Sequence, residues 1–176
     1  MWRAAGNVQR AALPRRLLPW LYDRGSLTLR LQQASDGDFR VQVLSQGWQR
    51  PLLNERLALS MGHHEYGMVR QVLLIGKGEP WVYARSVIPT RTMSGAGQQL
   101  AMLGNRPLGA FLFANNGVVR EPMAIACVCP DEMIYDDVVV GLGLKQQRVW
   151  GRRSVFRFEQ KPLLVSEFFL PSIPAR

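Results

Sequence analysis

The sequence has few of the side chains that bind metal ions or form disulfides. Its 176 residues include two cysteines and two histidines. Cys127 and Cys129 lie one residue apart, which is too close for an ordinary disulfide within a strand. His63 and His64 are adjacent, so they point in different directions and have no partner pair at metal-ligand spacing. We therefore expect free thiols, surface histidines and no metal site.

A cluster of acidic residues is a further candidate for binding a divalent cation. Its members are Asp131, Glu132, Asp136 and Asp137. Their spacing fits no EF-hand loop, and they lie between two apolar runs where a turn is expected. The preferred interpretation is a solvated turn.

Long hydrophobic runs are also missing. No apolar stretch approaches the roughly eighteen residues that a membrane-spanning helix needs, and the N-terminus lacks the pattern of a secretory signal. These absences predict no membrane span and favour a cytoplasmic protein. Residues 1–20 are rich in arginine and contain no acidic residue, which is also the composition of a transit peptide. We interpret this basic N-terminal segment as a short amphipathic helix.

Acidic residues are outnumbered by basic ones, and the net charge is +9. Such a charge is common in nucleic-acid-binding proteins. Here, however, most basic residues are spread singly through strand-like segments, without a dense block or an RNP1-like motif. We therefore predict no specific nucleic-acid binding. A small anionic substrate fits the same charge, because a positive cleft raises the local concentration of anions.

Signatures of ATPases and serine hydrolases are absent. "GKGEP" lacks the end of a phosphate-binding loop and the helix that must follow it. "MSGAG" at 93–97 does not satisfy the GxSxG pattern. With 47% hydrophobic residues and no Gly-, Pro- or Ser-rich linker, residues 21–176 are expected to form a single domain.

Alternation of apolar and polar residues predicts a strand and two hairpins. "FRVQVLSQGW" predicts a strand at 39–48. "MVRQVLLIG" and "WVYARSVIP", joined by "KGEP", predict an antiparallel hairpin, and "WGRRSVFRFEQKPLLVSEFFLP" predicts another that turns at "EQK". "SLTLRLQQAS" begins at Ser26, a good N-cap, and is interpreted as a helix, although its leucines also fit a strand. Residues 94–116 predict two short helices, the second ending at "NNG".

Two charged residues, Arg70 and Glu167, fall on apolar faces of these strands. The residues that share their faces are Met68, Val72 and Leu74 for Arg70, and Leu163, Val165 and Phe169 for Glu167. A charge is seldom buried without a partner. The two residues could form a buried ion pair with no catalytic role, or they could bind a ligand.

Three ordered segments resemble the chorismate pyruvate-lyase family. "WGRRS" followed by "KPLLVSEFFLP" is similar to the C-terminal signature of that family, "GEPWVYARSVIP" to its central hairpin, and "LGNRPLGAFLF" to its helical segment. The resemblance extends from about Leu21 to Pro174. It implies an α+β fold with a single antiparallel sheet of about six strands and flanking helices. It also implies an internal site beneath helical flaps that uses neither metal nor organic cofactor.

The resemblance assigns roles to four residues. Arg70 matches an arginine that binds a ligand carboxylate, and Glu167 matches a glutamate near the other end of the ring. Leu108 and Leu27 match positions whose main-chain groups hold the ligand's polar atoms, and Leu27 replaces an expected methionine. Residues 122–149 form a longer excursion than expected for the family, which leaves open whether this segment covers the flap.

The implied activity converts chorismate to 4-hydroxybenzoate and pyruvate, the first step of ubiquinone synthesis. Arg70 suits one of the two chorismate carboxylates, because a guanidinium offers two parallel donors. Arg85, Arg152 and Arg153 are candidates for the second, although alternation makes Arg153 the more exposed. Glu167 is expected to hydrogen-bond the ring hydroxyl and to assist proton movement.

A sensor of small aromatic carboxylates, without catalysis, is the alternative. Ligand-sensing domains of some bacterial transcription regulators resemble the same fold. Such domains usually follow a DNA-binding segment, and about twenty residues precede the matched region here, so we expect an enzyme. Its expected partners are chorismate and 4-hydroxybenzoate, and it is expected to be a monomer.

Overall fold

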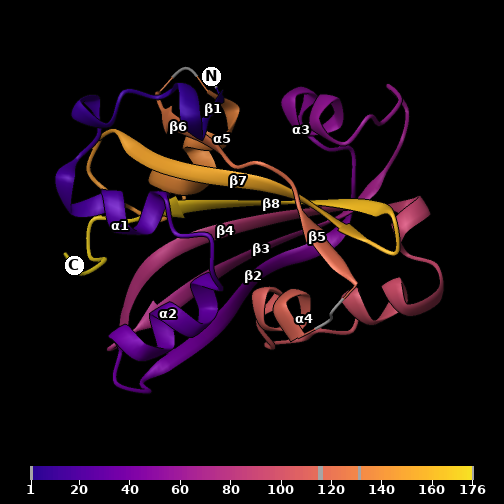
Figure 1. The fold of residues 1–176 in the computed structure, drawn as a ribbon, viewed down its shortest axis with the longest axis horizontal. Coiled ribbons are helices and arrows are strands. Elements are labelled where there is room, and N and C mark those ends of the chain that lie inside the picture. Colours follow the sequence, from indigo (N-terminus) through magenta and orange to yellow (C-terminus); the bar gives the residue numbers. More distant parts are fainter. Residues whose placement is uncertain (1, 115–116, 131, 176) are drawn as a thin grey trace.

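The computed structural model describes residues 2–114, 117–130 and 132–175. Within these ranges, eight strands form one antiparallel sheet, in the order β1-β6-β7-β8-β4-β3-β2, with β5 pairing with β7 beside β6 (Figure 1). The strands are β1 (Arg3–Ala4), β2 (Phe39–Gln49), β3 (Gly67–Gly76), β4 (Glu79–Pro89), β5 (Val118–Arg120), β6 (Ala124–Val128), β7 (Val149–Phe158) and β8 (Lys161–Phe169).

The α+β class and the antiparallel sheet are confirmed, whereas the expected number of strands is wrong. In the described ranges, six strands have five residues or more, and the two further strands, β1 and β5, have two and three residues. Pieces this short carry no recognisable period-2 pattern, because alternation needs about four residues to be seen.

Both predicted hairpins are present. β3 and β4 pair through a turn at Lys77 and Gly78, whose φ angles are 52° and 78°. β7 and β8 pair through Glu159 and Gln160, whose φ angles are 49° and 62°. Two successive residues with positive φ match the twist of the flanking strands. Glycine adopts this conformation freely, so the second turn is strained relative to the first.

Helices cover both faces of the sheet (Figure 1). The α-helices are α1 (Leu18–Leu21), α2 (Leu27–Ala34), α3 (Leu53–Ala58), α4 (Leu108–Ala114) and α5 (Met133–Tyr135). Shorter or irregular helical turns are η1 (Ala5–Asn7), η2 (Arg10–Ala12), η3 (Arg15–Leu17), η4 (Thr90–Thr92), η5 (Gly95–Leu100) and η6 (Asp136–Val140). α2 and α4 pack on one face, and α3, α5 and η6 pack on the other.

The predicted helices of the central region are largely confirmed. α2 forms with Ser26 as its N-cap, whose hydroxyl accepts a hydrogen bond from the Leu29 N–H at 3.4 Å. η5 and α4 correspond to the two short helices predicted for 94–116. The predicted end of the second helix at residues 115–116 lies outside the described residues.

The basic N-terminal segment does not form the expected amphipathic helix. Instead, it forms the short strand β1 and a series of short turns before α1. Pro14 lies within this series, and proline supplies no backbone N–H and disfavours helix at the preceding residue. The apolar residues Leu13, Leu17 and Trp20 are buried in the same core as α2. In the described part of the chain, no helix is long and apolar enough to span a membrane.

The cysteines and histidines lie as expected. Cys127 and Cys129 are free and half-buried, and His63 and His64 are exposed. The acidic cluster differs from the predicted turn, since Asp136 and Asp137 lie in η6 and Glu132 directly precedes α5. Asp131 lies outside the described residues.

Candidate active site

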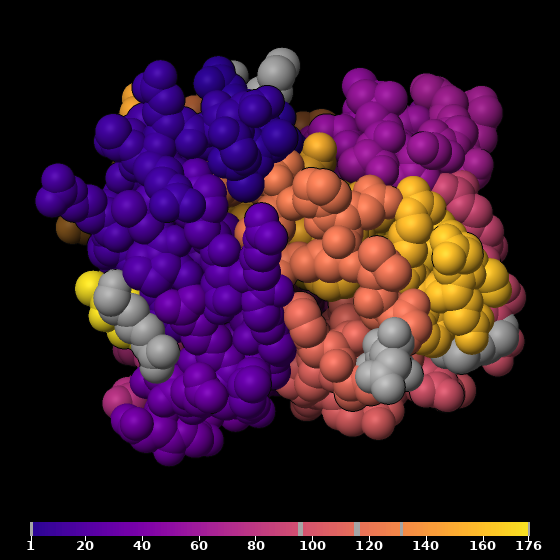
Figure 2. Space-filling view, viewed as in Figure 1, coloured from indigo at the N-terminus to yellow at the C-terminus, as the bar shows by residue number. Residues whose placement is uncertain are grey.

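A cavity lies between the sheet and the pair of helices α2 and α4, and its empty volume, measured out to open solvent, is about 570 Å³. Its lining includes all four predicted site residues, Arg70, Glu167, Leu27 and Leu108. Its walls are otherwise largely apolar, with a small number of polar side chains, which is typical of a site for a small molecule. Figure 2 shows α2 in violet meeting residues 105–114 and 117–125, in salmon and orange, along a seam on this face.

Arg70 is a buried cation without an anionic partner. It lies in the middle of β3, is 2% exposed, and has no carboxylate partner among the described residues. Its Nη1 donates to Gln46 Oε1 at 2.9 Å, and its Nη2 donates to the Arg106 carbonyl at 3.3 Å. Burial lowers the pKa of Arg70, but a guanidinium remains protonated in proteins. A buried positive charge held by neutral groups favours an anionic ligand.

Glu167 presents one carboxylate oxygen to a partner and leaves the other available. It lies on β8, directly opposite Arg152 on β7, and Arg152 Nε donates to Glu167 Oε2 at 2.6 Å. Its Oε1 has no hydrogen-bond partner in the described part of the chain. Arg70 and Glu167 are therefore not each other's ion-pair partners, and β4 separates their strands.

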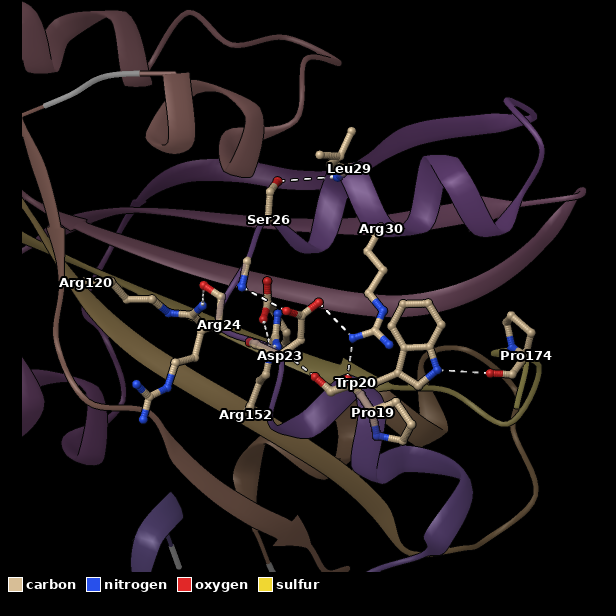
Figure 3. Close-up of polar contacts among 12 residues, drawn as sticks. Pro19, Trp20, Asp23, Arg24, Ser26, Leu29, Arg30, Arg120, Arg152 and Pro174 are labelled. Carbon is tan, nitrogen blue, oxygen red and sulfur yellow. Dashed lines mark hydrogen bonds and ion pairs between the residues drawn. The ribbon is translucent and has the colours of Figure 1, made fainter. Parts of the chain in front are cut away.

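Arg152 ties the glutamate to the segment between α1 and α2. Its guanidinium is 1% exposed, and its Nη1 donates to the carbonyls of Trp20 and Asp23, each at 2.7 Å. Figure 3 shows Arg152 reaching this segment from below. The same segment continues through Gly25 to Leu27, both of which line the cavity. One arginine therefore fixes both the carboxylate and part of the cavity wall.

Asp23 stabilises that segment through its carboxylate. It accepts hydrogen bonds from the Gly25 N–H at 2.9 Å and from Arg30 Nη1 at 2.8 Å (Figure 3). Burial alone would raise the pKa of Asp23, but the Gly25 N–H and the Arg30 guanidinium outweigh burial and hold the pKa below its usual value. The carboxylate is therefore charged at neutral pH, and it holds α2 close to the loop that precedes it.

The main-chain groups at Leu27 and Leu108 lie where two helices begin at the cavity. Leu27 is the first residue of α2, and Leu108 is the first residue of α4. The first N–H groups of a helix have no partner within the helix, so they can donate to another group. The two helices touch closely at Gly109, where an added Cβ would lie 2.7 Å from Thr28 Oγ1.

Two of the arginines considered for a second carboxylate lie on the opposite face of the sheet. Arg85 forms a buried pair with Glu55, at 2.8 Å from Nε to Oε1. Arg153 donates to Asn54 and stacks over the ring of Trp2. Arg152 does face the cavity, but it is committed to Glu167.

Sequence reasoning missed Arg120, which also lines the cavity. It belongs to the three-residue strand β5, pairs in register with Phe156, and lies over the Phe156 ring at 5.3 Å. Only the sheet pairing brings it to the site, because "VVREP" is too short to reveal a strand face.

The excursion at residues 122–149 does not cover the cavity. None of the described residues from 124 to 149 lines it. Ile134, Tyr135 and Val138 instead pack against Tyr83 and Phe168 on the opposite face. The segment therefore adds to the second core and leaves the roof of the cavity to α2 and α4.

Known proteins resemble the chain in sequence as well as in fold. The sequence is 43% identical over 154 residues to a probable chorismate pyruvate-lyase from Methylococcus capsulatus, covering 88% of this chain and 94% of the relative. It is 40% identical to one from Pseudomonas aeruginosa, covering 89% of this chain and 84% of the relative. The C-terminal domain of a histidine utilization repressor from Pseudomonas syringae has a similar fold, with a TM-score of 0.59 and 11% identity, covering 78% of this chain and 95% of that one. The model of the chorismate lyase family matches residues 1–176, and the chain belongs to this family.

Proposed function

We propose that the protein is a chorismate pyruvate-lyase, a carbon–oxygen lyase that converts chorismate to 4-hydroxybenzoate and pyruvate. Family membership and the named relatives support this proposal. The observation that carries it at the site is Arg70, a buried guanidinium in a largely apolar cavity with no carboxylate partner among the described residues. The reaction opens ubiquinone synthesis, and its product is an aromatic carboxylate.

The reaction removes the enolpyruvyl ether from the chorismate ring. The ether C–O bond breaks with its electron pair moving to oxygen, a ring C–H proton is lost, and the enol product takes up a proton on carbon to become pyruvate. Formation of the aromatic ring supplies a large driving force. The protein is therefore required chiefly to orient the substrate, to exclude water and to manage protons, and the proposal calls for no metal or cofactor.

Arg70 is proposed to bind the carboxylate on the ring. Its Gln46 and Arg106 contacts fix the plane of the guanidinium without neutralising it. A carboxylate that accepts two parallel N–H donors is held in direction as well as in position. The main-chain N–H groups at Leu27 and Leu108 are proposed to hold the remaining polar atoms of the ligand.

Glu167 is proposed to hydrogen-bond the ring hydroxyl and to assist proton transfer. Arg152 binds its Oε2, so Oε1 is the atom available to substrate. Because Arg152 is also anchored on two carbonyls, the carboxylate cannot rotate freely, which is the preorganisation that proton transfer at a fixed atom requires.

The test is turnover of chorismate by the wild type, by two variants of the site and by two control variants. Arg70→Gln should lower kcat/KM roughly a hundredfold or more, because two charge-assisted hydrogen bonds are lost. Glu167→Gln should lower kcat by roughly a hundredfold or more. Arg40→Gln and Glu159→Gln change exposed residues and serve as matched controls, with activity close to wild type. Wild-type kcat in Glu167→Gln would rule out the proton-transfer role.

A sensor that binds without catalysis is the second candidate. The similar fold of a transcription repressor domain is the observation that favours it. It predicts tight binding of 4-hydroxybenzoate by the wild type with no release of pyruvate from chorismate. We further propose that the enzyme acts as a monomer in the cytoplasm and has no specific nucleic-acid partner.

A further inference from the structure

Arg120 lies between the cavity and a hollow on the outside of the molecule. It lines the cavity, and it also lines a second hollow whose empty volume, measured out to open solvent, is about 1210 Å³. Arg10 and Arg24 line that outer hollow as well. Arg120 therefore forms part of a partition between the candidate active site and this outer hollow, which we call the basic vestibule.

The contacts of Arg120 leave its charge uncompensated. Its Nε donates to Ser154 Oγ at 2.9 Å, and its Nη1 donates to the Arg24 carbonyl at 3.1 Å, as Figure 3 shows for the latter. No carboxylate forms an ion pair with it among the described residues. Burial lowers the pKa of Arg120 and the nearby Arg152 lowers it further, although the carboxylates of Glu167 and Asp23 oppose this effect. Arg120 is half-buried and Arg70 is buried, and an anion would stabilise either cation.

The sheet register places Arg120 across the cavity from Arg70. Arg70 pairs with Ser86, Ser86 with Val165, and Val165 with Ser154, which is the residue that Arg120 contacts. Three strand spacings of about 4.8 Å separate Arg70 from Ser154, or roughly 14 Å between backbones. Long side chains extend inward from both sides, so two guanidinium groups approach the ligand space from opposite directions.

Arg152 also faces the cavity, but it is less suited than Arg120 to bind an anionic group of a ligand. Its Nε and Nη1 are taken by Glu167 and by two backbone carbonyls. If Arg152 turned to a substrate carboxylate, the Glu167 carboxylate would lose its partner. Arg120 contacts a hydroxyl, a carbonyl and the ring of Phe156, none of which is charged, so it can accept an anion without leaving another charge unpaired.

We propose that Arg120 binds the second carboxylate of the substrate, the one carried by the enolpyruvyl ether. This inference rests on the proposed lyase function and adds a specificity-determining residue to it. The ring carboxylate occupies Arg70, and the three-carbon acid lies beside Arg120, next to the vestibule through which it can leave. The product 4-hydroxybenzoate carries only the ring carboxylate, so it has no group for Arg120.

The difference between substrate and product supplies the test. Arg120→Gln should raise the KM for chorismate roughly tenfold or more, the fold-change expected for loss of one charge-assisted hydrogen-bonded pair. The affinity for 4-hydroxybenzoate, measured by calorimetry, should stay within about twofold of wild type. Arg70→Gln should weaken both ligands, and Arg157→Gln, on the exposed end of β7, should weaken neither.

A conservative variant separates binding from structure. Arg120→Lys keeps the charge and should give a KM between those of the wild type and Arg120→Gln, and its thermal unfolding reports whether the fold is intact. An unchanged KM in Arg120→Gln, or equal losses of chorismate and 4-hydroxybenzoate affinity, would overturn the inference. If the wild type itself fails to release pyruvate from chorismate, the proposed function fails, and this inference fails with it.

Discussion

Replacement of Arg152 by methionine tests the central ion pair of the site. The change removes a guanidinium that is 1% exposed and keeps a side chain of similar length. It leaves Glu167 Oε2 without its donor at 2.6 Å, and it leaves the carbonyls of Trp20 and Asp23 without theirs. The Glu167 side chain is 15% exposed, so water replaces the lost donor only in part.

The expected loss of stability is large for a single substitution. Removing one partner of a buried pair costs about 3–5 kcal/mol, because the remaining charge is unpaired. Each carbonyl that loses its donor costs about 1 kcal/mol of that amount. The net stability of a domain is about 5–15 kcal/mol, so Arg152→Met removes a substantial fraction of it. The double variant Arg152→Met with Glu167→Gln should regain about 1–3 kcal/mol, since the unpaired carboxylate is gone and the two carbonyls remain unpaired.

Urea unfolding followed by tryptophan fluorescence measures these differences, with Trp20 as a buried reporter. Arg157→Met is the matched control, since this arginine is on the same strand and its ion pair with Glu121 is largely exposed. The control should change the free energy of unfolding by less than about 1 kcal/mol. A similarly small effect of Arg152→Met, or strict additivity in the double variant, would refute the buried ion pair.

Three further changes have defined outcomes. Gln160→Gly should raise the urea midpoint by an amount equivalent to about 1 kcal/mol, because residue 160 has a φ of 62° and glycine adopts this conformation without strain; a lower midpoint would contradict this. Gly109→Ala should force α2 and α4 apart at Thr28 and speed the dissociation of 4-hydroxybenzoate in stopped-flow measurements. An unchanged dissociation rate would show that this contact between the helices does not control release of the ligand. The pKa of Asp23 in the folded protein lies below its ordinary value of 3.8. The charged carboxylate therefore contributes to stability at pH values above 3.8, and this contribution is lost as the pH falls through the pKa of the folded state. Asp23→Asn should therefore be less stable at pH 6 and lose less stability between pH 4 and pH 2 than the wild type.

The two hairpins and α2 could be predicted because their sequences carry local signals. The turn residues "KGEP" and "EQK" interrupt a clear alternation of apolar and polar residues, and Ser26 marks the start of a helix. β1 and β5 could not be predicted, because short strands are defined by their partners, β6 and β7, more than by their own residues. The N-terminal segment was misread because arginines spaced along a chain suggest a helix face even where proline interrupts it.

The predicted site residues were brought to one cavity, but their partners were not foreseen. Strand alternation was sufficient to place Arg70 and Glu167 on one face of the sheet. It did not reveal that Glu167 pairs with Arg152, because the pairing depends on the register of β7 against β8. Arg120 was missed for a related reason, since β5 reaches the site only through its pairing with β7.

The most direct test of the proposed activity is to incubate the purified wild-type protein with chorismate in the presence of a metal chelator and to quantify 4-hydroxybenzoate and pyruvate in the same sample. A chorismate pyruvate-lyase should release both products in equimolar amounts, at a rate proportional to protein concentration. Tight binding of 4-hydroxybenzoate with no pyruvate released would contradict it and would favour the sensor.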